Sequence, residues 1–194
     1  MGFIGSLEML GSIFGFICVA LYTRRNLLSW PAGLIQVLIF VYVFYEVKLY
    51  SDMFLHIVFV FLQIYGWVNW ANEKETKGDI QIRRLNYKIF FLTGIIGIVC
   101  TYLLGTGMQN WTDASFPYTD AGLAVFSLIA QWMIAKKILE NWLYWIIIDI
   151  CSIALYAFKE LYFTCGLYFL FFILSIIGYY SWSLSINKKD QFLS

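Results

Sequence analysis

The sequence predicts an all-α integral membrane protein with seven transmembrane helices, and three observations support this fold class. Apolar residues make up 61% of the chain and charged residues only 13%, well below the roughly 25% charge of a typical soluble domain. The apolar residues gather in runs close to the ~20 residues with which a helix crosses a bilayer. These runs are continuous and lack the alternating pattern of a membrane β-strand, so we interpret them as helices.

Charged residues, Gly and Pro mark the breaks between the runs. The first run ends at Arg24 and Arg25, and the second begins beside Pro31 and ends before Lys48. The third stops at NEKETK, the fourth follows RRLN and the fifth begins just after Pro117. The sixth follows KKILEN, and the seventh lies between KE and NKKD. The predicted spans are residues 5–23, 29–46, 52–70, 87–106, 119–135, 142–158 and 161–182.

The basic residues predict how the chain crosses the membrane. No Lys or Arg precedes Arg24, so the first run does not resemble a cleaved signal and is expected to be retained. With seven spans, 11 of the 13 basic residues fall on one side, and only Lys48 and Lys159 on the other. The positive-inside rule then places the N-terminus outside and the C-terminus in the cytoplasm. The loop 105–120, which has no basic residue, is expected outside.

An internal repeat organises the chain. Shifting it by 112 residues aligns residues 27–70 with 139–182 without a gap and gives 10 identities in 44 positions, including two tryptophans and a glycine. This predicts two three-helix repeats, 5–70 and 119–182, joined by a linking helix at 87–106. Because a single span separates them, the repeats cross the membrane in the same direction. Such 3+1+3 parallel repeats are typical of secondary transporters, whose substrate sites lie between the halves.

Asp149 is the most central acid of the predicted spans, with seven residues of the sixth span on either side. An ionisable group at this depth costs about 2.5–3.5 kcal/mol, so it faces protein or water and indicates a functional site. Asn141, Trp145 and Asp149 follow each other at a spacing of four, which places an amide, an indole and a carboxylate on one helix face. The alternative is an acid that only bonds two helices together.

Other spans add amides and indoles to this predicted site. The third span carries Gln63, Trp67 and Trp70 on one side, although the tryptophans also fit an interfacial aromatic belt. Further candidates are Asn69, Gln36 and Gln131, of which Gln131 is expected near Asn141. Aromatic walls, a few amides and one acid suit a small, flat, polar cation, because indole faces attract cations.

Several other classes of function lack support in the sequence. The four cysteines lie in apolar runs without a CxxC spacing, so we predict neither a metal site nor a cofactor. The net charge of +1 gives no reason to expect a nucleic-acid partner. Motifs of proteases, hydrolases and nucleotide-binding loops are missing, so an enzyme is not favoured. A membrane-embedded enzyme or a non-transporting assembly subunit remains the alternative to a transporter.

The segments 27–70 and 138–182, with their motifs YGWVNW and ENWLYW, resemble the Pnu family of bacterial vitamin transporters. The resemblance covers nearly the whole chain. It implies a fold similar to that of SWEET proteins, a homotrimer, and facilitated diffusion followed by phosphorylation of the cargo in the cytoplasm. Matched to the family motifs, the implied substrate-binding residues are Trp67, Trp70, Asn141, Trp145 and Asp149.

The cargo implied by the resemblance is nicotinamide riboside, thiamine or riboflavin. Asp149 departs from the nicotinamide riboside branch, in which Asn is familiar after NWxxW. We interpret the acid as favouring thiamine, which has a cationic thiazolium and an aminopyrimidine that donates hydrogen bonds. Nicotinamide riboside, whose ring is also cationic, is the alternative, and riboflavin is disfavoured because it is larger and neutral.

Overall fold

The computed structural model describes residues 2–112 and 116–193. Residues 113–115 of the predicted external loop lie outside this description, as do the side chains of Lys188 and Lys189 in the basic C-terminal segment. The described chain forms seven helices, each long and apolar enough to cross a membrane. They are α1 (Phe3–Thr23), α2 (Ser29–Glu46), α3 (Tyr50–Lys77), α4 (Tyr87–Trp111), α5 (Pro117–Ala135), α6 (Asn141–Phe158) and α7 (Tyr162–Leu193).

The predicted spans agree with these helices, but α3, α4 and α7 continue beyond them. Helix α4 runs to Trp111, into the segment 105–120 that was predicted as a loop. Helix α3 runs to Lys77, past the predicted end at residue 70, and α7 continues past residue 182. Hydropathy marks only the part of a helix that lies in lipid, whereas polar helix formers such as Glu and Lys extend it into water. Helix α3 ends where Gly78 takes a left-handed conformation, with φ of 75°, and its N–H bonds the carbonyl of Lys74.

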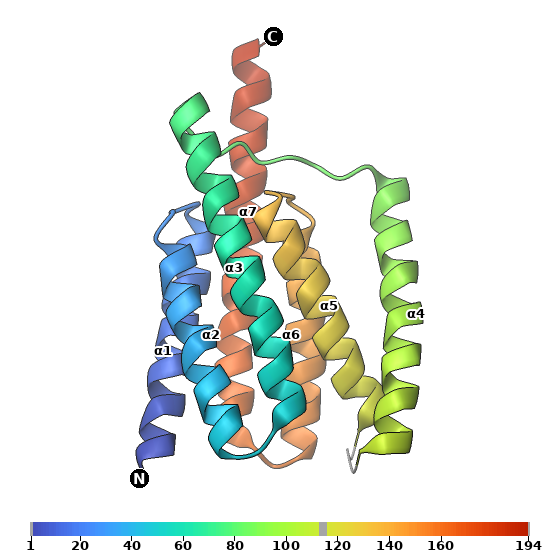
Figure 1. The fold of residues 1–194 in the computed structure, drawn as a ribbon. Coiled ribbons are helices and arrows are strands. Elements are labelled where there is room, and N and C mark those ends of the chain that lie inside the picture. Colours follow the sequence, from blue (N-terminus) through green and yellow to red (C-terminus); the bar gives the residue numbers. More distant parts are fainter. Residues whose placement is uncertain (1, 113–115, 194) are drawn as a thin grey trace.

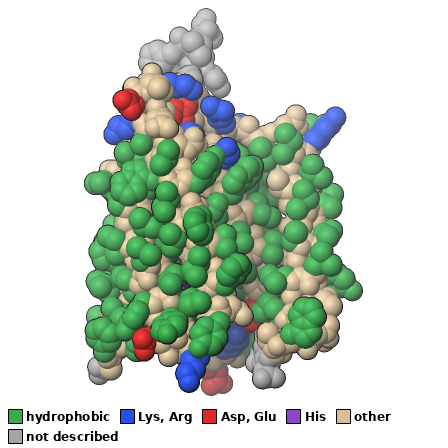
Figure 2. Space-filling model, viewed as in Figure 1, with side chains coloured by type: hydrophobic (Ala, Val, Ile, Leu, Met, Phe, Trp, Pro, Cys, Tyr) green, Lys and Arg blue, Asp and Glu red, His purple; other side chains and the backbone are tan. Residues whose placement is uncertain are grey.

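Six of the helices close into a ring. Neighbours pack in the order α1, α2, α3, α5, α6, α7 and back to α1, while α4 packs on the outside against α5 (Figure 1). The N-terminus lies at one end of the bundle and the C-terminus at the other (Figure 1). Hydrophobic side chains cover the middle of the molecule, and Lys and Arg gather at the end that carries the C-terminus (Figure 2). This distribution is that of a multi-pass membrane protein.

Four buried tryptophans form the core near the end of the bundle that carries the C-terminus. We call Trp30, Trp70, Trp142 and Trp182 the tryptophan cluster; each has at most 1% of its surface exposed. Edge-to-face contacts join Trp30 to Trp70 at 5.2 Å and Trp142 to Trp182 at 5.4 Å between ring centroids. Such contacts add about 0.5–1.5 kcal/mol each beyond the burial of area.

Two indole hydrogen bonds join helices that are far apart in the sequence. Trp70 donates to the carbonyl of Ile134 at 3.1 Å, and Trp182 donates to the carbonyl of Tyr22 at 2.9 Å. Both donors and both acceptors are related by 112 positions, so α3 bonds α5 in the same way as α7 bonds α1. Each of the two carbonyls lies at a helix end and also accepts a backbone N–H, from Lys137 and from Arg25 respectively.

The helix turns show the same spacing. Among the described residues, the non-glycine residues with positive φ are Arg25, Lys48, Lys137 and Glu160. They form two pairs 112 positions apart, at the α1–α2 and α5–α6 turns and at the α2–α3 and α6–α7 turns. A left-handed conformation is uncommon outside glycine, so its occurrence at equivalent positions reflects one turn geometry used twice.

The segment between α3 and α4, residues 78–86, ties the bundle together at its basic end. We call it the connector. Arg83 exchanges backbone hydrogen bonds with the α5–α6 turn, giving its N–H to Lys137 and accepting from Leu139, both at 2.9 Å. On the other side, Arg25 of the α1–α2 turn pairs with Asp79 at 3.4 Å. The connector therefore contacts both the α1–α2 turn and the α5–α6 turn.

Glu73, at the end of α3, is the acid that pairs with the buried Lys137. The ammonium group of Lys137 contacts one carboxylate oxygen of Glu73 and also donates to the carbonyl of Asn69 at 3.3 Å. Lys77 pairs with the other carboxylate oxygen at 3.1 Å. Both Glu73 and Lys137 are under 8% exposed. Glu73 also pairs with Lys77 and Arg83, so it is the buried charge of Lys137 that depends on this one ion pair.

Glu73→Gln is expected to lower the stability of the folded protein by about 2–3 kcal/mol, somewhat less than the loss of a fully enclosed ion pair. The substitution keeps a hydrogen-bond acceptor but leaves the Lys137 charge without a partner. Thermal unfolding in detergent, followed by tryptophan fluorescence, measures the effect. Glu75→Gln is the control because Glu75 lies on the same turn and is exposed. Equal stability of the two variants would contradict a structural role for the pair.

Candidate functional site

Asp149 is buried at the middle of α6, as the predicted stripe requires. Asn141, Asp149 and Ser152 are all buried, and their spacing of eight and three places them on one face of the helix. Asp149 is 2% exposed, and its Oδ2 accepts a hydrogen bond of 2.9 Å from Ser175 on α7. Its Oδ1 has no donor within the described ranges. One carboxylate oxygen is therefore held in place, and the other is left for a further donor or cation.

Asn141 and Trp145 each keep one buried polar atom without a partner. The Asn141 amide donates to the carbonyl of Ile138 at 2.5 Å, but its Oδ1 accepts no hydrogen bond within residues 2–112 and 116–193. The indole N–H of Trp145 is unpaired in the same part of the chain. Leaving such a group buried and unpaired costs about 1–3 kcal/mol. A ligand that pairs with both atoms would recover this cost.

The indoles of Trp30 and Trp142 are also unpaired within the described chain, but their surroundings differ. Both rings are packed inside the tryptophan cluster, where Trp30 covers Gly66 and Trp142 covers Gly178. Trp145 is only half-buried and lies at the border of two apolar clusters. Of these three indoles, Trp145 is therefore the best placed to contact a ligand.

Two glutamines meet at one tyrosine in the interior. The hydroxyl of Tyr22 on α1 donates to Gln63 Oε1 on α3 at 2.9 Å and accepts from Gln131 Nε2 on α5 at 3.1 Å. Each of the three residues is at most 4% exposed. A side chain at Gly33 would collide with the Gln63 amide, so the glycine makes room for it. The amide of Gln131, expected near Asn141, is thus bonded to Tyr22 instead.

The predicted residues of α3 divide between the interior and the surface. The buried residues Gln63, Gly66, Trp70 and Glu73 follow one stripe along the helix. Trp67 lies roughly 80° around the helix from the centre of this stripe and is 38% exposed. Trp70 belongs to the tryptophan cluster, with its indole N–H already bonded. The sequence pattern predicted Gln63, Trp67 and Trp70 on one side of α3. In the structure Gln63 and Trp70 belong to the buried stripe, whereas Trp67 lies outside it.

Asn69 and Gln36 have structural contacts of their own. Asn69 donates to the carbonyl of Ala135 at 2.6 Å, which links α3 to the end of α5. Gln36 is half-buried on α2, and its amide lies against Gly15 of α1. The structure thus gives Asn69 a role in helix packing, whereas the Gln36 amide lies at the contact of α1 and α2.

Tyr22 and Ser175 are interior polar residues that the sequence reasoning did not select. Each lies in an apolar run as a hydroxyl-bearing residue, which is the signal that was available. Their importance depends on partners far away in the chain, since Tyr22 bonds Gln131 and Ser175 bonds Asp149. Local periodicity does not show such pairs.

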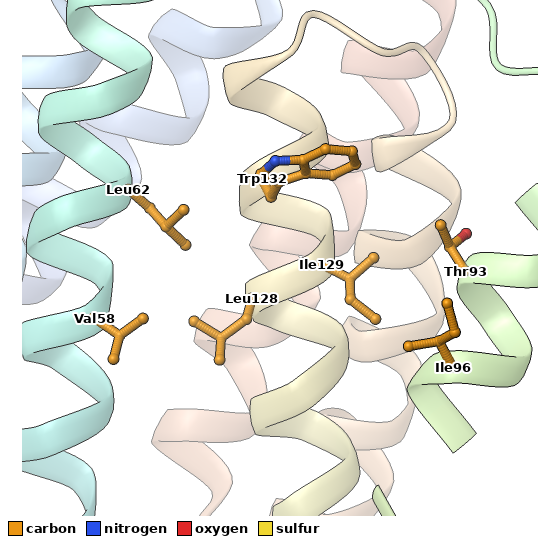
Figure 3. Close-up of a pocket in the computed structure, with 7 residues that line it drawn as sticks. All are labelled: Val58, Leu62, Thr93, Ile96, Leu128, Ile129 and Trp132. Carbon is orange, nitrogen blue, oxygen red and sulfur yellow. The ribbon is translucent and has the colours of Figure 1, made fainter. Parts of the chain in front are cut away.

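An apolar groove lies away from these polar groups. It has a volume of about 340 Å³ and separates α3 from α4 across α5 (Figure 3). The residues that line it are Val58, Leu62, Thr93, Ile96, Leu128, Ile129 and Trp132. None of them is a predicted site residue, and the exposed lining is apolar. The groove suits hydrocarbon chains rather than a polar solute.

Comparison with known proteins gives consistent results. A family model described as nicotinamide mononucleotide transporter matches residues 5–184. The nicotinamide riboside transporter PnuC of Escherichia coli is 25% identical, over 95% of this chain and 88% of that protein. The riboflavin/roseoflavin transporter RibM of Streptomyces davaonensis is 25% identical, over 95% and 87%. The crystal structure of the vitamin B3 transporter PnuC has a TM-score of 0.76 and 24% identity, covering 94% of this chain and 82% of that one.

Proposed function

This chain belongs to the nicotinamide mononucleotide transporter family, and on that premise we propose that it carries a cationic vitamin by facilitated diffusion, with nicotinamide riboside as the first cargo. As a member of this family it is a multi-pass vitamin transporter. The observation that carries the proposal is the buried Asp149 with one free carboxylate oxygen, on the same helix as the unpaired atoms of Asn141 and Trp145. A cationic ring with hydrogen-bonding substituents matches these groups.

The proposed binding residues fall into two groups. Asn141, Trp145 and Asp149 contact the cargo from α6, and Gln63 and Gln131 contact it from α3 and α5. Each of these five is buried or half-buried and carries a polar group. The remaining candidates have secondary roles in this proposal, in cargo entry or in the packing around the site; they are Gln36, Trp67, Asn69 and Trp70.

We propose nicotinamide riboside rather than thiamine as the first cargo because of the cargo named for the relatives. The relatives from Escherichia coli and Neisseria mucosa are both nicotinamide riboside transporters. The thiamine preference inferred from Asp149 has no support among the relatives reported above. Thiamine remains the second candidate, because its thiazolium would be attracted to the same carboxylate. Riboflavin is neutral, so it would gain the least from the charge of Asp149.

We propose that the helices form two parallel three-helix repeats around this site, with α4 as the linking helix. Three observations support the proposal: the crossed indole bonds, the paired left-handed turns, and the contacts of Gly66 with Trp30 and Gly178 with Trp142. All of them relate positions 112 residues apart. The cargo would then move between the halves as they rock against each other, as in SWEET-like transporters.

The proposed orientation follows from the charges at the two ends. The basic end of the bundle would face the cytoplasm, with the N-terminus outside the inner membrane (Figure 2). Cargo would enter down its gradient and be trapped by a cytoplasmic kinase. A homotrimer, implied by the family resemblance, is part of this proposal.

Purified protein in liposomes is expected to equilibrate labelled nicotinamide riboside in the absence of any ion gradient. The physical reason is that a facilitator supplies a path but no energy coupling, so the final internal concentration equals the external one. Uptake of nicotinamide riboside, thiamine and riboflavin, each measured with and without proton and sodium gradients, tests the proposal. Accumulation that depends on a proton or sodium gradient when the membrane potential is held at zero would contradict facilitated diffusion. Absence of flux for all three would contradict transport of these vitamins.

A further inference from the structure

Tyr22 holds two amides from different helices with one hydroxyl. Its ring is fixed by edge contacts with Trp30 at 5.0 Å and Trp70 at 5.9 Å between centroids. Its own carbonyl accepts the indole N–H of Trp182. The position of the hydroxyl between Gln63 and Gln131 is therefore set by the tryptophan cluster rather than by the glutamines.

The single proton of a phenol makes the two glutamines unequal. The hydroxyl donates to Gln63 through the amide oxygen and accepts from Gln131 through the amide nitrogen. A primary amide has an acceptor oxygen and a donor nitrogen. Gln63 thus keeps its Nε2 as a donor, and Gln131 keeps its Oε1 as an acceptor. Within the described part of the chain, the hydrogen bonds to Tyr22 use neither of these two atoms, and Gln63 Nε2 lies against Gly33 of α2.

We propose that Tyr22 is a positioning residue that fixes this donor and acceptor pair and thereby selects a cargo edge with an acceptor beside a donor. A primary carboxamide has such an edge, and so does an aminopyrimidine. A carboxylate presents two acceptors, one of which would face the Gln131 oxygen without a proton between them. The inference rests on the proposed function, because it assumes that the two glutamines contact the cargo.

The selectivity between an amide and an acid tests this role. Binding of nicotinamide riboside and of nicotinic acid riboside is measured by calorimetry on wild-type protein, Tyr22→Phe and Tyr144→Phe. Repulsion between a cargo carboxylate and Asp149 is the same in all three proteins. A change in the ratio of the affinities for the amide and the acid riboside therefore reflects a change at the two glutamines. Tyr144→Phe is a matched control because its hydroxyl also bonds two groups, Thr93 and the Phe90 carbonyl, away from the glutamines.

Tyr22→Phe is expected to reduce the preference for the amide by about tenfold, since the glutamine amides become free to rotate and present oxygen or nitrogen to either cargo. Tyr144→Phe should leave the ratio unchanged. Thiamine and oxythiamine, in which the amino group is replaced by an oxygen, form a second pair read in the same way.

Gln131→Leu provides an independent variant if Tyr22→Phe fails to fold. It removes the amide oxygen that would face a cargo carboxylate and adds no charge, so the preference for the amide should also fall. An unchanged ratio in either folded variant would overturn the inference while leaving transport intact. Wild-type protein that binds none of the four compounds would instead overturn the proposed function, and the inference with it.

Discussion

Asp149→Asn is expected to weaken binding of a cationic cargo by about tenfold to a hundredfold. A hydrogen bond or contact with a charged group contributes about 1.5–3 kcal/mol, more than its neutral counterpart. The substitution removes the charge but keeps the oxygen that accepts from Ser175, so the fold around it is retained. Calorimetry on the purified protein, with nicotinamide riboside and with thiamine, gives the loss for each. We expect the larger loss with thiamine, because its aminopyrimidine also donates to a carboxylate.

The charge of the cargo provides the control for this experiment. Dihydronicotinamide riboside has nearly the same shape but an uncharged ring, so its affinity should change little on Asp149→Asn. Asp79→Asn, at an exposed acid of the connector, should leave the binding of all three compounds unaltered. Equal losses for the charged and uncharged rings would show that Asp149 acts through packing. If the affinity for every cargo were unaltered, Asp149 would not contact the cargo and would only bond α6 to α7.

The number of helices could be predicted from the sequence because lipid imposes a simple rule on each span. A run of apolar residues has to form a helix, since its backbone groups find no other partners in hydrocarbon. The ends of α3 and α7 did not follow from this rule, because it says nothing about helix that continues into water. Lys77, the last residue of α3, is set by the left-handed Gly78.

The site was predictable where a polar residue interrupts an apolar helix and not where it depends on contacts between helices. Asp149 and Asn141 stood out by depth and spacing, and the structure buries both. Trp67 was placed with Gln63 and Trp70 by helical periodicity, but the buried stripe of α3 lies to one side of it. The role of Tyr22 depends on a residue 109 positions away, which no local pattern reveals.

Gly66→Ala and Gly178→Ala are each expected to destabilise the protein by about 3 kcal/mol, at the upper end for overpacking a dense core. A methyl group at Gly66 would overlap the ring of Trp30, and one at Gly178 would overlap the ring of Trp142. Neither indole has room to move, because both are less than 2% exposed and packed against other tryptophans. Thermal unfolding in detergent, with the yield of monodisperse protein, measures the loss.

Gly166→Ala is the matched control for these two variants. Gly166 lies on α7 like Gly178, but a methyl group there meets no atom within 4 Å, and alanine favours the helix by about 1 kcal/mol over glycine. This variant should be as stable as the wild type or more so. Replacing Trp30 by Leu should partly rescue Gly66→Ala, because the smaller side chain frees the space that the methyl group needs. If Gly66→Ala and Gly166→Ala unfold at the same temperature, the glycine and tryptophan contacts do not set the distance between α2 and α3.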